Sequence, residues 1–252
     1  MKMMEQILRL DTVNSTNDVL KSLAEQGAKE GQIVVAEEQS AGKGRRGRSF
    51  SSPKGKGIYF SYLLRPEKLD ASVSTLTPRA AVAVSRAIQK VSGMCPQIKW
   101  VNDLVIRGKK VCGILTEMAM EGGKIHHVIL GIGINVNQEA EDFPEELAEI
   151  ATSLSIEAGR TFSRERLIEE LVKELDEMWR GMETTGGEYL EEYRRRCVTT
   201  GQDVCVIYGS SRRKARAIQV NEDYSLQVEY EEGERENLNS GEVSVRGVEG
   251  YV

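Results

Sequence analysis

A loop that alternates glycine with cations is the segment of this sequence best suited to bind an anion. Residues 42–48 read GKGRRGR, and residues 42–56 contain no acidic residue. Gly42, Gly44 and Gly47 let the backbone reach φ > 0 and approach a ligand closely. Arginine can bind phosphate or carboxylate with two hydrogen bonds. We therefore expect the loop to order over an anionic ligand. A solvated loop or a patch that binds nucleic acid is the competing interpretation.

A second set of reactive side chains lies in KWVND at residues 99–103 and in GKK at residues 108–110. A lysine beside a strand end can place its charge on a phosphate during transfer. Asp103 could hold Mg²⁺ or orient a lysine. A plain hairpin with a charged tip is the alternative interpretation, and this segment alone does not decide between them.

Two further segments offer uncharged polar groups. In NSTND, residues 14–18, Ser15 or Thr16 can cap a helix, and the same hydroxyl and N–H groups can bind a polar ligand. In GIGINVN, residues 131–137, the two glycines indicate close backbone approach, and Asn135 offers amide donors and an acceptor. The second segment is not a dinucleotide fingerprint, because the third glycine and the acidic partner are missing.

The elements that must position these groups indicate an α/β protein. Apolar runs predict strands at residues 6–10, 32–38, 57–64 and 124–137, and two strands joined by a turn at residues 107–109 within residues 97–120. Helical spacing of apolar residues predicts helices after residue 15, over residues 77–93 with Thr77 as cap, over residues 163–179, and in a short segment ending near residue 196. Short β-like runs follow, so we expect a catalytic domain at 1–196 and a small β domain at 197–252.

Composition excludes several classes of protein. The 252 residues carry a net charge of −5, and 40% are hydrophobic, which is enough for a core. No signal peptide or run of about 20 apolar residues is present. Four cysteines lie far apart, which indicates free thiols in a cytoplasmic protein. His126 and His127 are adjacent and would face opposite sides of a strand, which argues against a zinc site or a Ser-His-Asp triad.

Taken in order, STN, EEQSAGKGRRGR, KWVNDL, GKKVCGIL and GIGINVN resemble the motifs of the biotin–protein ligases, and ATSL and GEVSVRG extend the resemblance over residues 11–247. The resemblance is to the monofunctional type, without an amino-terminal DNA-binding domain. It implies a mixed β-sheet with flanking helices, like that of the lipoate ligases, and a small carboxyl-terminal SH3-like barrel. It also implies that biotin is activated by ATP, with Mg²⁺, as biotinyl-5′-AMP. The biotin then passes to a lysine of a biotin carboxyl-carrier domain, such as that of acetyl-CoA carboxylase. No nucleic-acid or membrane partner is expected, and a homodimer is possible.

The resemblance also assigns roles to residues. Those expected at biotin are Ser15, Thr16, Asn17, Gln39, Lys43, Gly44, Arg45, Lys110 and Gly113. Those expected at ATP or the adenylate are Arg45, Arg46, Arg48, Asn102, Lys110 and Asn135. Lys110, Arg45 and Asp103 are expected to be catalytic, with Asp103 also a metal ligand. The family usually has arginine in place of Lys43 and tryptophan in place of Phe50, so the arginine fork and the indole donor are absent here.

Two alternatives remain open at this point. A lipoate ligase or octanoyl transferase of the same superfamily would share the fold, and an octanoyl transferase would need a reactive cysteine such as Cys112. A nucleic-acid-binding module would use the basic loop with the β-rich tail. Only 6% of residues are aromatic and the tail contains the acidic segment EYEEGERE, which both count against that module.

Overall fold

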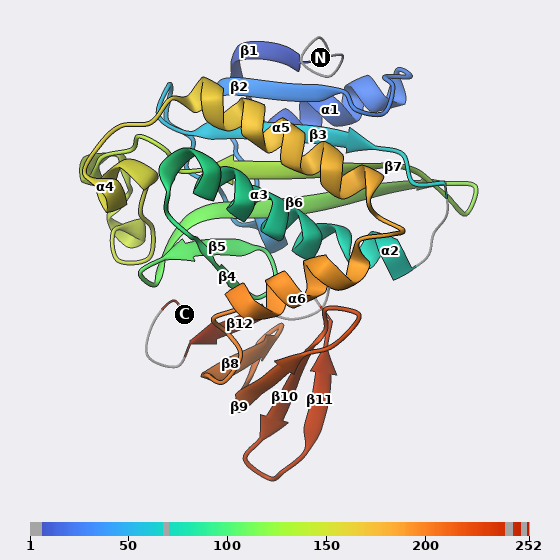
Figure 1. The fold of residues 1–252 in the computed structure, drawn as a ribbon, viewed down its shortest axis with the longest axis vertical. Coiled ribbons are helices and arrows are strands. Elements are labelled where there is room, and N and C mark those ends of the chain that lie inside the picture. The colour runs from blue at the N-terminus through green and yellow to red at the C-terminus, as the bar shows by residue number, and fades with distance from the viewer. Residues whose placement is uncertain (1–6, 68–70, 240–243, 248–250, 252) are drawn as a thin grey trace.

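The computed structural model describes residues 7–67, 71–239, 244–247 and 251, and its centre is a seven-stranded mixed sheet (Figure 1). The strand order is β1-β2-β3-β7-β6-β5-β4. β1 and β2 are parallel, and the other neighbours are antiparallel. The strands are β1 (Ile7–Val13), β2 (Ile33–Gln39), β3 (Ile58–Leu64), β4 (Gln97–Lys99), β5 (Asp103–Ile106), β6 (Lys109–Glu121) and β7 (Lys124–Ile134).

Helices cover the two faces of this sheet unequally. The long helices α3 (Leu76–Ser92) and α5 (Arg164–Arg180) lie across one face (Figure 1). They pack on side chains that alternate along the strands, such as Phe60 and Ile132, to form the main core. On the opposite face, α1 (Thr16–Glu25) packs Leu20 and Ala24 on a small second cluster of Val34, Leu63 and Ile129. Because α1 is short, it leaves part of this second face for a site.

A second, antiparallel sheet follows the mixed sheet, in the order β11-β10-β9-β8-β12. Its strands are β8 (Asp203–Tyr208), β9 (Ser211–Val220), β10 (Leu226–Tyr230), β11 (Arg235–Leu238) and β12 (Ser244–Gly247). α6 (Gly186–Arg196) lies between the two sheets (Figure 1). This arrangement confirms the predicted α/β fold with a small SH3-like β unit at the carboxyl end. The domain boundary after residue 196 stays a prediction.

The remaining elements are short. They are α2 (Ala71–Ser74), α4 (Leu154–Ala158) and three 3-10 turns, Arg45–Gly47, Ala140–Asp142 and Glu145–Leu147. Among the described residues, no helix has the length and apolar content needed to cross a bilayer.

Two local predictions were wrong. Residues 97–120 form three strands rather than two, because the chain turns at residues 100–102, where the Trp100 N–H donates to Thr199 Oγ1 over 2.9 Å. Thr77 does not cap α3: the helix begins one residue earlier, and the Thr77 hydroxyl lies 2.6 Å from that of Thr116. In the basic loop only Gly47 among the three glycines has positive φ, 74°, and Arg46 shares that region at 58°. Gly42 and Gly44 instead allow close packing, because a side chain on either would crowd the main chain of the loop.

Candidate functional site

A cavity of about 620 Å³ opens on the face of the large sheet that α1 partly covers. It is lined by every residue to which the sequence assigned a role. These are Ser15, Thr16, Asn17, Gln39, Lys43, Gly44, Arg45, Arg46, Arg48, Asn102, Asp103, Lys110, Gly113 and Asn135. They come from segments spread over 120 residues of chain, so the fold brings the motifs together at one place. The individual contacts with a ligand stay predictions.

The floor of the cavity is a row of glycines on neighbouring strands. Gly133 of β7 pairs with Tyr59 of β3 on one side and with Gly113 of β6 on the other, and Gly113 pairs with Asp103 of β5. A Cβ on Gly133 would lie 2.6 Å from the ring of Phe50. Since real Cβ atoms do not approach that closely, the glycine allows Phe50 to lie flat against the sheet. This confirms the close approach that the sequence predicted.

One end of the cavity is an uncharged hydrogen-bonding network at the amino end of α1. The N–H and hydroxyl of Thr16 donate to Gln39 Oε1 over 2.9 and 3.1 Å, and Gln39 Nε2 donates to Ser52 Oγ over 2.9 Å. Ser61, fully buried on β3, donates to Thr16 Oγ1 over 2.8 Å. Ser15 occupies the N-cap position, but its side chain makes no capping hydrogen bond. Its hydroxyl lines the cavity, as a ligand-binding role requires.

The Asn17 side chain continues this network toward β6. Its Nδ2 donates to Glu117 Oε2 over 2.6 Å, and its Oδ1 accepts from Ser61 Oγ at the same distance. A Cβ on Gly131 would lie 2.3 Å from that Oδ1, so only glycine fits beneath Asn17. The network therefore fixes the orientation of the Asn17 amide before any ligand arrives.

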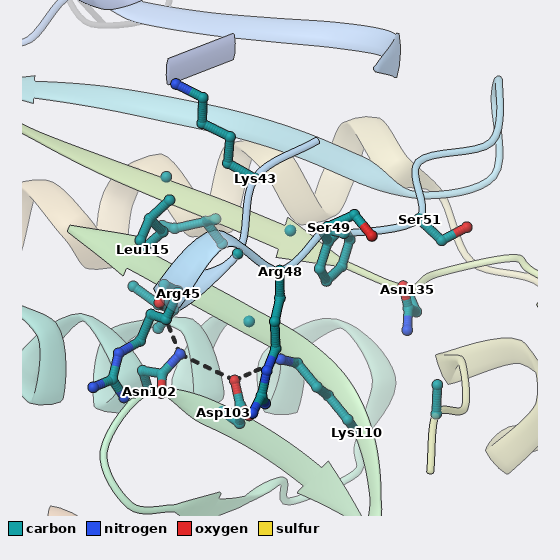
Figure 2. A pocket seen from close by; sticks show the side chains of 18 of the residues that line it. Lys43, Arg45, Arg48, Ser49, Ser51, Asn102, Asp103, Lys110, Leu115 and Asn135 are labelled. Carbon is teal, nitrogen blue, oxygen red and sulfur yellow. Dashed lines mark hydrogen bonds and ion pairs between the residues drawn. The ribbon is translucent and has the colours of Figure 1, made fainter. Parts of the chain in front are cut away.

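The other end of the cavity is ionic, and Asp103 is its centre (Figure 2). Lys110 Nζ lies 2.7 Å from Asp103 Oδ1, and Asn102 Nδ2 donates to the same oxygen over 3.1 Å. Arg45 of the basic loop donates to Asn102 Oδ1 over 2.9 Å, which connects the loop to this group. Figure 2 shows Arg48 extending from the loop toward Asp103 and Lys110.

Burial and surplus positive charge set the protonation states at the ionic end. Burial alone would raise the pKa of Asp103, but the charge and hydrogen bond of Lys110 lower it below its ordinary value. Burial lowers the pKa of Lys99 to about 8, and the charges of Lys110, Arg246 and Arg48 lower it too, whereas Asp103 opposes them. Burial also lowers the pKa of Arg45. Lysine and arginine side chains outnumber the two carboxylates of the cavity lining, Asp103 and Glu149, which favours an anionic ligand.

The basic loop crosses the cavity in a conformation held by contacts of its own main chain and side chains, although most of its residues are exposed to solvent. Lys43 and Ser49 form a β-bridge at its base, and Gly44 N–H donates to Arg48 O over 2.6 Å. Lys43 Nζ forms an ion pair with Asp18 of α1, and Figure 2 shows this side chain pointing away from Lys110. The Lys43 contact with biotin stays a prediction.

Arg46 and Asn135 have structural partners in addition to their place in the lining. Arg46 Nη1 donates to Ile207 O of β8 over 3.4 Å, so the loop reaches the second sheet. Asn135 Nδ2 donates to Thr152 O over 3.0 Å, and its Oδ1 accepts from Gln138 Nε2 over 3.2 Å. Asn135 thus holds the ATSL segment at the end of β7.

Several lining residues had no assigned role in the sequence-based prediction. Lys99, only 6% exposed, and Arg246 both line the cavity and add positive charge to it. Tyr251 gave no signal, because a single aromatic residue near the chain end belongs to no motif. Its hydroxyl donates to Asp103 Oδ2 over 2.5 Å.

The side chains around Asp103 do not fit a resident magnesium ion. Both carboxylate oxygens accept hydrogen bonds, Oδ1 from Lys110 and Asn102 and Oδ2 from Tyr251. Within the described ranges, no group of three or more His, Cys, Asp or Glu side chains is placed to hold a metal. An Mg²⁺ site prefers several oxygen ligands in octahedral geometry. A magnesium ion held by these side chains alone is therefore not indicated, and the metal role of Asp103 stays a prediction.

The thiol of Cys112 is poorly placed to act as a nucleophile. Its side chain is fully buried and does not line the cavity. Burial raises the pKa of its thiol well above the ordinary range, which keeps it protonated. Among the described residues all four cysteines are free.

Comparison with known sequences places residues 10–135 in the biotin/lipoate A/B protein ligase family. The bifunctional ligase/repressor BirA of Bacillus subtilis is 44% identical over 176 residues, which cover 70% of this chain and 54% of that protein. The biotin–[acetyl-CoA-carboxylase] ligase of Mycobacterium tuberculosis is 33% identical over 208 residues, 79% of this chain and 74% of that one. This chain spans about half the length of its Bacillus relatives.

Comparison with solved structures finds the same group of proteins. The biotin protein ligase of Aquifex aeolicus in complex with biotin and ATP superposes with a TM-score of 0.81 at 30% identity, and the match covers 96% of this chain and 99% of that one. Both sheets of this chain therefore have counterparts in a structure that holds biotin and ATP.

Proposed function

This chain belongs to the biotin/lipoate A/B protein ligase family, and we propose that it is an ATP-dependent biotin–protein ligase. It activates biotin as biotinyl-5′-AMP and transfers the biotinyl group to a lysine of a biotin carboxyl-carrier domain. One observation carries the proposal: a single cavity joins an end where hydroxyl and amide side chains offer hydrogen bonds to an ionic end rich in cations. Biotin has this polarity, because its ureido ring is neutral and its valerate chain ends in a carboxylate.

The uncharged end suits the ureido ring. Ser15, Thr16, Asn17 and Gln39 present hydroxyl and amide groups there. Hydrogen bonds between Thr16 and Gln39, from Asn17 to Glu117 and from Ser61 to Thr16 fix the positions of donors and acceptors. Preformed polar groups of this kind bind a matching ligand with little loss of side-chain entropy. The glycine floor lets Asn17 and Phe50 lie close against the sheet.

The ionic end suits the activation step. The biotin carboxylate attacks the α-phosphorus of ATP, a new O–P bond forms, and pyrophosphate leaves. Both reactants are anions, so cations must offset their repulsion as they approach, and Lys110, Arg45 and Arg48 are available to do so. Asp103 holds the Lys110 ammonium in place. Magnesium would arrive on the phosphates of ATP and offset part of their charge.

The basic loop suits the need to protect the product of that step. A mixed anhydride is hydrolysed by water, and a closed loop excludes water from it. Arg45 holds the loop over the cavity through Asn102, and the hydrogen bond from Gly44 to Arg48 shapes the loop itself. In the second step the lysine amine of the acceptor attacks the biotinyl carbonyl, AMP leaves as the C–O bond to phosphate breaks, and the amine loses a proton.

The acceptor and the cellular setting follow from the relatives. A carboxyl-carrier domain of a carboxylase is the proposed partner, because the Mycobacterium tuberculosis relative is named for acetyl-CoA carboxylase. We place the protein in the cytoplasm, where free thiols persist. Homodimer formation and the absence of a nucleic-acid partner stay predictions.

An octanoyl transferase is less well supported, because Cys112 is buried and lies outside the cavity. A lipoate ligase would need no ureido contacts, and the hydrogen-bonding end of the cavity would then have no function.

The proposal is tested by incubating the purified protein with ATP, Mg²⁺ and an intact carboxyl-carrier domain, with biotin, lipoate or octanoate as the acid. Mass spectrometry should show a single biotinyl group on the acceptor, with none on a variant whose target lysine is arginine. Modification by lipoate or octanoate in preference to biotin would contradict the proposal.

A further inference from the structure

Tyr251 reaches the ionic end of the cavity from beyond the last strand of the second sheet. Its hydroxyl donates to Asp103 Oδ2, and its ring lies against the side chain of Lys99, with Nζ 3.5 Å from the ring centroid. Val245 and Arg246 of β12 line the same part of the cavity. The second sheet therefore supplies side chains to the site and does not only pack beside it.

The contact with Lys99 addresses an electrostatic problem. The lysine is 6% exposed, and Lys110, Arg246 and Arg48 all disfavour its charged form. A buried ammonium without compensation loses its proton or moves toward water. The electron-rich face of an aromatic ring stabilises a cation at this distance, and the stabilisation grows when water is absent. The Tyr251 ring thus helps Asp103 to keep Lys99 charged and in place.

The contact with Asp103 does not compete with the groups that the reaction needs. Lys110 and Asn102 use Oδ1, whereas Tyr251 uses Oδ2. The carboxylate is therefore fixed from both oxygens, and the Lys110 ammonium keeps its orientation toward the cavity. A tyrosine that only blocked the site would be expected to take the carboxylate oxygen that Lys110 uses. Tyr251 binds the other oxygen instead.

We propose that Tyr251 is a positioning residue for the nucleotide: its ring and hydroxyl hold Lys99 and Asp103 in the arrangement that binds the phosphates of ATP. This inference rests on the proposed function, since it concerns the phosphate end of the same cavity. It assigns to the carboxyl-terminal segment a part in nucleotide binding and none in the recognition of biotin, whose uncharged end is built from α1, β2 and β3.

The test compares Tyr251→Leu and Tyr251→Phe with wild type, and with Tyr208→Phe as a matched control. Tyr208 lies in β8, and its hydroxyl also donates to a carboxylate, Glu236 Oε1 at 2.7 Å, but it does not line the cavity. ATP and biotin affinities are measured by calorimetry, and KM and kcat by biotin-dependent pyrophosphate exchange. Thermal unfolding of each variant reports on folding.

We expect Tyr251→Leu to weaken ATP binding roughly tenfold, the size of one desolvated cation–π contact, and to raise the KM for ATP equally. Tyr251→Phe keeps the ring and should lose only about threefold, for the one missing hydrogen bond. The KM for biotin should stay within about twofold of wild type in both variants, because neither substitution changes a group that binds biotin. Tyr208→Phe should match wild type.

Unchanged ATP affinity in Tyr251→Leu would overturn the inference, and tighter ATP binding would overturn it in favour of a blocking role. Either result, with biotin-dependent exchange by wild type, leaves the proposed function standing. If wild type catalysed no pyrophosphate exchange with any of the acids, but Tyr251→Leu still lost ATP affinity, the proposed function would fall. The role of Tyr251 in ATP binding would stand.

Discussion

Lys110→Ala separates the chemistry of the site from the stability of the fold. Lys110 Nζ lies 2.7 Å from Asp103 Oδ1, and their side chains are 26% and 16% exposed. Removing one partner of a fully buried pair costs about 3–5 kcal/mol. Here the lysine reaches solvent, and Asp103 keeps the donors Asn102 and Tyr251, so we expect a loss of about 1–2 kcal/mol and a Tm lower by about 3–6 °C.

The effect of the same substitution on catalysis should be far larger. The ammonium faces the position where charge develops as the carboxylate attacks the α-phosphorus, and one such preorganised group contributes about 10²–10³ in rate. Pyrophosphate exchange should therefore fall by that factor while the protein still unfolds cooperatively. Lys109→Ala is the matched control, because Lys109 precedes Lys110 in β6, donates to Ala148 O and does not line the cavity. Retention of more than about a tenth of wild-type exchange would refute the reasoning.

The stability difference between wild type and Lys110→Ala should also depend on pH. The pKa of Asp103 is lowered in the folded protein, so its ionised form stabilises the fold above the unfolded value of about 4. That contribution is lost as the pH falls below about 4 toward the folded pKa. Denaturant unfolding at pH 7 and at pH 3 should therefore show a smaller difference at pH 3. An equal difference at both pH values would mean that the ion pair does not cause it.

Three further substitutions test other parts of the site. Arg45→Gly breaks the hydrogen bond to Asn102, so we expect early release of biotinyl-adenylate. Release is measured as labelling of lysines on a bystander protein, and full retention of the adenylate would contradict the role of the loop. Gly133→Ala forces Phe50 from the sheet and should weaken biotin binding by about tenfold. The double variant with Phe50→Ala should recover part of this loss. Independent effects of the two substitutions would show that the two residues do not meet. Cys112→Ala should leave biotin transfer within about twofold of wild type, whereas an inactive protein that still folds would revive the acyl-transferase alternative.

The sequence predicted the members of the site better than their roles. Motif residues as distant as Ser15 and Asn135 line one cavity, as the resemblance implied. Their side chains are partly engaged elsewhere: Lys43 pairs with Asp18, and Asn135 holds the Thr152 carbonyl. A motif shows that a residue type is needed at a position, but pairing with residues outside the motif depends on tertiary packing.

The fold was predictable where local patterns decide it. The long helix α5 follows from apolar spacing and a capping Ser163, whose side chain accepts from Arg166 N–H. The break at Trp100 was missed, because its causes lie about 100 residues away, in Thr199 and in the Tyr224 carbonyl that accepts from the indole. Tyr251 was missed for the same reason. Contacts between the two sheets leave no periodic signal in either segment.

Exchange of labelled pyrophosphate into ATP tests most directly whether one cavity activates biotin. The purified protein is incubated with ATP, Mg²⁺ and labelled pyrophosphate, with biotin, lipoate, octanoate or no acid. Our account predicts exchange that depends on biotin and that is lost in Lys110→Ala but not in Lys109→Ala. Folded protein that exchanges equally with every acid, or with none, would contradict it.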